Sequence, residues 1–359
     1  MKKIIAAAVL LCILLSGCSS WMNGSYAVVT PHTEPANHQG RPTNTISSYE
    51  QLRYVLVSMV EGGEESALLS VKYADEERIR PDMDKAVNEI CQSNPYAVYA
   101  VEDIQYEMSS GTGPKTVSVR VTYRPNRAEM KRIKKASNAE QIEAIVSQQL
   151  DDCAAGVVLY VQNPVRIDYV QMVADYAWEN PQQVMEAPEV SVSLYPEMGE
   201  KQIVELRFSY RSSREELRAM KEKVAPVFVS AEKYAATEQD EKEKAQKLYS
   251  FLMNRYKYMQ QTSITPTYSL LMHGVGDSQA FAVVYAAMCR QVELNCKVVI
   301  GTRSGEPWAW NVMEIDGIFY HLDLLRCDGA DGFKLYTKEE MTDYVWDYSI
   351  YPARAKEIS

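Results

Sequence analysis

The hydrophobic pattern of the first two thirds of the chain predicts two similar runs of helices and strands. Apolar residues at helical spacing alternate with short apolar runs, and each series ends in strictly alternating segments such as Val117, Val119 and Val121. We expect two small α+β modules, each with one sheet face covered by helices and the other open to water. The predicted helices are 49–60 and 83–91 in the first module and 139–150 and 167–178 in the second, with strands at 68–73 and 156–161.

The two modules resemble one another in sequence, which indicates an internal duplication of about 90 residues. Matching positions lie 90, 89 and 87 residues apart along the chain. They are Gln51 and Gln141, Tyr106 and Tyr195, and Tyr123 and Tyr210. We therefore expect 47–133 to superpose on 137–220 with one topology. Neither copy carries paired carboxylates, a glycine-rich loop or a nucleophile spaced to meet a base, which favours a spacer or protein-contact role over ligand binding.

The N-terminal segment is typical of a secretory signal peptide. Lys2 and Lys3 precede an apolar run from Ile4 to Leu15, which is shorter than the ~20 residues that a membrane-spanning helix needs. The run ends in Leu-Ser-Gly-Cys, which resembles the lipobox of bacterial lipoproteins. That resemblance implies removal of residues 1–17 and acylation of Cys18, with chains such as palmitate holding the protein on the outer side of a cell membrane. Residues 18–46, rich in Ser, Asn, Thr and Pro, are expected to form a flexible tether.

Composition narrows the range of partners and cofactors. The net charge of −10 becomes −12 once Lys2 and Lys3 leave with the signal peptide, which argues against nucleic acid and against a basic membrane-binding face. Removing Cys12 and setting Cys18 aside leaves five of the seven cysteines, with no CxxC motif, and the chain has four histidines. These numbers predict that most of the cysteines are buried hydrophobic residues and not part of a disulfide framework, and they predict neither a metal site nor another cofactor.

The C-terminal third has a different pattern. A charged amphipathic helix is expected over 239–258, and an apolar helix follows the segment Gly274-Val275-Gly276-Asp277-Ser278. Strands are predicted from Cys296 to Gly301, from Trp308 to Ile315 and from Ile318 to Asp323. The Asp316-Gly317 pair between the last two strands predicts a tight hairpin.

This pattern resembles the transglutaminase-like fold of bacterial surface proteins, which is related to the papain-type cysteine enzymes. In that family a Gly-x-Gly-x-Cys segment places a cysteine at the start of a helix. A His-Ala-Trp-Asn strand supplies the base, and an Asp at the end of the next strand orients the His. The corresponding positions in this chain are Ser278, Trp308 and Asp323, so only the Asp keeps its identity.

The substitutions imply loss of catalysis. Serine needs a general base, and the tryptophan indole has an N–H donor but no lone pair that could accept a proton. We expect no catalytic residues, an N-cap role for Ser278, a buried Trp310 and a hydrogen bond from Trp308 Nε1 to Asp323. Under this hypothesis Ser278, Trp308 and Asp323 line a groove that binds a peptide, a protein or a cell-wall ligand.

Two alternatives stay open from the sequence. One is a slow serine hydrolase or acyl transferase that uses Ser278 with His321 as a relocated base, or with His273. The other is a purely structural surface spacer. The overall prediction is an α+β lipoprotein with two tandem duplicated modules at 47–136 and 137–230, followed by a transglutaminase-like α+β domain at 231–359.

Overall fold

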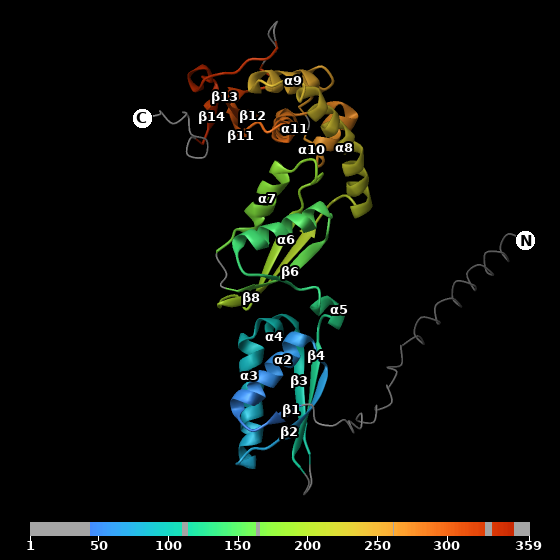
Figure 1. Cartoon of the computed structure of the whole chain (residues 1–359), viewed down its shortest axis with the longest axis vertical. Coiled ribbons are helices and arrows are strands. Elements are labelled where there is room, and N and C mark those ends of the chain that lie inside the picture. The colour runs from blue at the N-terminus through green and yellow to red at the C-terminus, as the bar shows by residue number, and fades with distance from the viewer. Residues whose placement is uncertain (1–43, 110–113, 163–165, 261, 327–331, 348–359) are drawn as a thin grey trace, which may run out of the picture.

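The computed structural model describes residues 44–109, 114–162, 166–260, 262–326 and 332–347. The predicted signal peptide, Cys18, residues 18–43 of the predicted tether and Cys327 lie outside these ranges. The prediction of a tether is wrong at 44–46, because these residues form a strand of the first sheet and Ile46 is fully buried. Figure 1 shows two sheet-containing modules and a C-terminal domain that follow one another along the long axis of the molecule. In the part of the chain that is described, no helix is both long and apolar enough to cross a membrane.

The first module is a four-stranded sheet with helices on one face. Its strand order is β1-β2-β4-β3, in which β1 is parallel to β2 and the other pairs are antiparallel. The helix α2 begins where the Ser48 side chain accepts a hydrogen bond from Gln51 N, and it ends at Gly63 in the left-handed conformation. The elements are β1 (Asn44–Ile46), α2 (Tyr49–Gly62), β2 (Ser66–Val71), η1 (Glu76–Arg78), α3 (Ile79–Ser93), α4 (Pro95–Ala100), β3 (Val101–Met108), β4 (Thr116–Tyr123) and α5 (Arg127–Met130).

The second module has the same sheet topology. Its order is β5-β6-β8-β7, again with one parallel pair and two antiparallel pairs. A local detail is also shared, because Gln51 Oε1 accepts from the backbone and hydroxyl of Ser47 and Gln141 Oε1 accepts in the same way from Ser137. This agreement is what a duplication would produce. The elements are β5 (Lys134–Ala136), α6 (Ala139–Asp151), β6 (Gly156–Gln162), α7 (Tyr169–Glu179), β7 (Glu189–Tyr195) and β8 (Lys201–Ser209).

The open sheet face that the sequence predicts is partly covered in the second module. Ile203 and Tyr160 are buried in the core of the first module. The ring of Tyr160 lies 5.1 Å from the ring of Tyr96, which belongs to α4. The expectation of a fully wet face is therefore wrong at this end of the sheet, because α4 of the neighbouring module packs there.

The C-terminal domain has an antiparallel sheet in the order β13-β12-β11-β14 beside the buried helix α11. The predicted helix over 239–258 ends earlier, at Met253, and a short strand follows it. The long helix α8, absent from the sequence prediction, crosses residue 230 and buries Leu217 and Phe228 in the core of this domain. The elements are α8 (Arg214–Ala235), α9 (Glu241–Met253), β9 (Lys257–Tyr258), α10 (Pro266–Tyr268), η2 (Ser269–His273), β10 (Val275–Gly276), α11 (Ser278–Gln291), β11 (Cys296–Arg303), β12 (Glu306–Ile315), β13 (Ile318–Leu322), η3 (Lys338–Glu340) and β14 (Tyr344–Trp346).

Candidate functional site

The start of α11 places Ser278 beside strand β12. The N-cap is Asp277, whose side chain accepts from Ala280 N at 2.9 Å, so the prediction that Ser278 caps the helix is wrong by one residue. Ser278 is the first helical residue and is 8% exposed. Its Oγ accepts a hydrogen bond of 3.2 Å from the backbone N–H of Ala309, the residue after Trp308. The hydroxyl therefore holds the helix against the sheet.

Trp308 and Asp323 form the hydrogen bond that the sequence predicts. The indole Nε1 of Trp308 donates to Asp323 Oδ2 at 2.9 Å. Asp323 directly follows β13 and is 1% exposed, whereas Trp308 is half-buried with its ring 5.6 Å from that of Tyr258. The tryptophan thus satisfies a buried carboxylate and supplies no group that could remove a proton.

Three further donors, which sequence reasoning missed as Asp323 partners, also contact Asp323. Tyr344 Oη donates to Oδ2 at 2.6 Å, Arg303 Nη1 donates to the same oxygen at 3.3 Å, and Leu325 N donates to Oδ1 at 2.9 Å. Burial, followed by the nearby Asp323 charge, raises the pKa of Tyr344 well above its usual value, so its hydroxyl stays protonated as the donor.

The position of Arg303 could have been read from the sequence. The turn at Ser304-Gly305 pairs Gly301 with Trp308 across β11 and β12. Because side chains alternate along a strand, Arg303 then emerges on the same face as Gly301, next to Trp308. Its guanidinium carbon lies 5.3 Å from the Trp308 ring centroid. Tyr344 gave no such signal as a partner of Asp323, because β14 reaches β11 after a long connection.

His321 is not placed to act as the base for Ser278. It lies opposite Val312, as the predicted hairpin register requires, and it is 5% exposed. Its Nδ1 accepts a hydrogen bond of 3.0 Å from Trp310 Nε1, which can only donate. A neutral imidazole that accepts at Nδ1 carries its proton on Nε2, so neither nitrogen is free to accept another. Burial, with a smaller effect of Lys338, lowers the pKa of His321 to about 4.

The structure places the remaining sequence candidates in structural roles or at the surface. Trp310 is fully buried, as predicted. His273 is exposed, with its ring packed edge-on against that of Tyr268. Cys153, Cys289 and Cys296 are buried and Cys91 is exposed. Burial raises the pKa of the Cys289 thiol, and the neighbouring Cys296 adds to this effect. Among the described residues there is no group of three or more His, Cys, Asp or Glu side chains that could hold a metal ion.

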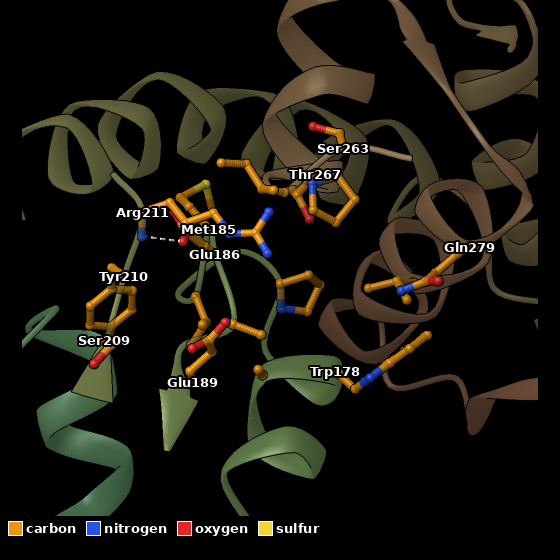
Figure 2. A pocket seen from close by; sticks show the side chains of 17 residues that line it. Trp178, Met185, Glu186, Glu189, Ser209, Tyr210, Arg211, Ser263, Thr267 and Gln279 are labelled. Carbon is orange, nitrogen blue, oxygen red and sulfur yellow. Dashed lines mark hydrogen bonds between the residues drawn. The ribbon is translucent and has the colours of Figure 1, made fainter. Parts of the chain in front are cut away.

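A cavity of about 370 Å³ lies between the second module and the C-terminal domain, as Figure 2 shows. None of Ser278, Trp308 and Asp323 lines it, although Gln279 and Val283 of α11 do. Its apolar walls come from α7, from the segments beside β7 and β8, and from α10, and they include Trp178, Pro181, Met185, Tyr210 and Pro266. No sequence motif indicated this cavity, because it forms where segments distant in the chain meet.

Comparison with known proteins identifies the superfamily that the C-terminal domain matches. Residues 230–329 match the model of the transglutaminase-like superfamily, so the chain contains a transglutaminase-like domain. Comparison with the curated proteins gave no match. Among solved structures, the crystal structure of a TGase is similar at 12% identity and a TM-score of 0.27, with 53% of this chain and 58% of that chain covered.

A second solved structure, provisionally assigned as a protease from Parabacteroides distasonis, is similar at 10% identity and a TM-score of 0.24. That alignment covers 72% of this chain and 40% of the other. The chain therefore spans less than two thirds of the length of either solved structure.

Proposed function

We propose that this chain is a membrane-anchored extracytoplasmic lipoprotein whose transglutaminase-like domain is non-catalytic and serves to bind a peptide, protein or cell-wall ligand. The observation that carries the non-catalytic part is the hydrogen bond from Trp308 Nε1 to Asp323. In the related enzymes that carboxylate orients a histidine base. Here the same carboxylate accepts a hydrogen bond from an indole, which cannot accept a proton as a base.

The local contacts of the serine support the same proposal. Ser278 Oγ accepts from the backbone of Ala309, and His321 is held by Trp310. A serine hydroxyl without a base reacts slowly, since removing one member of a nucleophile-base pair costs several orders of magnitude in rate. The alternative of a serine hydrolase or acyl transferase built on Ser278 and His321 therefore has little geometric support.

The test of the non-catalytic proposal compares turnover in the wild type with turnover in Ser278→Cys/Trp308→His. Peptide hydrolysis and amine incorporation into a glutamine-containing protein should both stay at background in the wild type. The double variant introduces a thiol and an imidazole beside the carboxylate of Asp323, and it is the smallest change that could revive thiol chemistry. Turnover by the wild type that disappears in Ser278→Ala would overturn the proposal.

The anchoring proposal depends on Cys18 and is tested separately. In Cys18→Ala, incorporation of radioactive palmitate should be lost and the signal segment should stay uncleaved at this position. Ser20→Ala is a matched control, because it changes a nearby residue without touching the lipobox. Unchanged palmitate labelling in Cys18→Ala would contradict lipidation at this residue.

The binding proposal is separated from the spacer alternative by a pull-down from envelope extracts and by sedimentation with purified cell wall. Both use the full chain and a chain that ends after the second module. Retention that requires the C-terminal domain supports binding. Equal retention of the two chains would favour the spacer alternative.

A further inference from the structure

Two charged side chains in the cavity between the second module and the C-terminal domain have no partner within the described part of the protein. Its charged lining residues are Glu186, Glu189 and Arg211. No hydrogen bond or ion pair joins the side chain of Arg211 or Glu189 to any described residue, and both residues are exposed. The cavity thus offers one cation and one carboxylate to a ligand.

The third charged residue, Glu186, fixes the backbone of Arg211. Glu186 is 5% exposed, and its Oε1 accepts from Arg211 N at 2.6 Å. Its Oε2 accepts from Ser212 N at 3.1 Å and from Ser212 Oγ at 2.7 Å. Three donors therefore satisfy this buried carboxylate and fix the backbone of Arg211. Figure 2 shows the Arg211 side chain extending from that fixed point into the cavity.

Neutral polar groups line the same space. The hydroxyl of Tyr210 is buried without a hydrogen-bond partner in the described part of the chain, and burial raises its pKa above the usual value. Gln279 reaches the cavity from α11 on the opposite wall (Figure 2). Because the Tyr210 hydroxyl is fully buried, it is not counted among the groups that contact the ligand.

The charges and walls together select a class of ligand. Arg211 is suited to a carboxylate or a phosphate, but two glutamates against one arginine disfavour a dianionic phosphate. Glu189 is suited to a positively charged group of the ligand, and Trp178 and Met185 are suited to an apolar side chain of the ligand. We infer that this cavity binds a zwitterionic amino acid or short peptide, with its carboxylate on Arg211, its ammonium group at Glu189 and an apolar side chain against the walls.

This site is separate from the Ser278 region that carries the proposed function. Gln279 and Val283 are four residues apart and share one face of α11, whereas Ser278 on another face contacts β12. The inference deepens the binding proposal by naming a ligand class, and its test does not use Ser278. Failure of one proposal can therefore be told from failure of the other.

The test is isothermal titration calorimetry of the full chain in detergent with alanyl-phenylalanine and alanyl-leucine. Arg211→Gln should weaken binding by about tenfold to hundredfold, since it removes charge-assisted hydrogen bonds to the carboxylate. Arg211→Lys should recover part of the loss. Because the Glu186 bond uses the backbone N–H of Arg211, Arg211→Gln should keep the thermal unfolding profile of the wild type.

Blocked ligands and a matched variant give the controls. The N-acetyl form of each dipeptide should bind more weakly to the wild type and be insensitive to Glu189→Gln, and the amide form should be insensitive to Arg211→Gln. Arg120→Gln changes an exposed arginine of the first module and should leave binding unchanged. Absence of binding of both dipeptides to the wild type at millimolar concentrations would overturn the inference. Equal affinity in Arg211→Gln, or tighter binding of phenyl phosphate than of the dipeptides, would do the same.

Discussion

The two sides of α11 differ in what they leave available to a ligand. Asp323 accepts hydrogen bonds from Trp308, Tyr344, Arg303 and Leu325 of the protein itself, and both this carboxylate and Ser278 are buried. Around Arg211, a buried carboxylate fixes the backbone while the guanidinium stays unpaired within the described chain. Under the proposed function, the polar cluster at Ser278, Trp308 and Asp323 serves the fold, and ligand binding is proposed where charges remain unmatched.

The largest expected effect is loss of stability when Asp323 is replaced. Asp323→Ala removes the shared acceptor of Trp308, Tyr344 and Arg303, and we expect the free energy of unfolding to fall by about 3–5 kcal/mol. A single stranded donor would cost about 1–3 kcal/mol, so the additional donors raise the expected loss. Chemical denaturation measures it. Asp343→Asn, at the exposed rim of the same network, should cost less than about 1 kcal/mol, and equal losses would contradict a central role for Asp323.

The next effect is a pH dependence that comes from His321. Its pKa is about 4 in the folded state and about 6.5 in the unfolded chain, so the unfolded state binds the proton more readily between these values. Stability from this residue is fully present above pH 6.5 and is lost as the pH falls toward 4, by up to about 3 kcal/mol. Denaturation curves of the wild type and of His321→Gln, measured at several pH values, give the contribution of His321 to the free energy of unfolding. If the free energy of unfolding of the two proteins changes with pH in parallel, His321 is not a buried neutral acceptor.

A smaller effect is expected at Ser278. Ser278→Ala removes the acceptor of the Ala309 N–H, and leaving that donor without a partner should cost about 1–2 kcal/mol in the free energy of unfolding. Ser278→Thr keeps the hydroxyl and should lose less. If Ser278→Ala proves more stable than the wild type, the hydroxyl does not hold α11 against β12.

The smallest effect on stability is expected at the cavity. Arg211→Gln should change the free energy of unfolding by no more than about 0.5 kcal/mol, because the side chain has no described partner and its backbone bond to Glu186 remains. This loss should therefore be far smaller than the loss in Asp323→Ala. A large destabilisation in Arg211→Gln would show that its charge serves the fold and not a ligand.

The sequence predicted those features that depend on local pattern. The helices near Gln51 and Gln141, the hairpin at Asp316-Gly317 and the Trp308–Asp323 bond all follow from periodicity, turn chemistry or the need to satisfy a buried carboxylate. The mixed α and β fold with its transglutaminase-like domain is confirmed.

Features that depend on contacts between distant segments were missed. Covering of the second sheet by α4, the donor role of Tyr344 and the cavity at Arg211 arise from packing across long stretches of chain. A single sequence carries no local signal for such contacts. The cap at Asp277 was misplaced by one residue because Asp and Ser are both good N-caps and stand side by side.

The most direct test of the central claim, that the transglutaminase-like domain does not use Ser278 in catalysis, is covalent labelling with a fluorophosphonate probe. We expect the folded wild-type chain to take up no more probe than Ser278→Ala, because no described side chain accepts a hydrogen bond from Ser278 and its Oγ accepts from Ala309 N. Mass spectrometry of the digested protein locates any adduct. Labelling of wild-type Ser278 that is abolished in Ser278→Ala would contradict the claim and favour the alternative of a serine hydrolase.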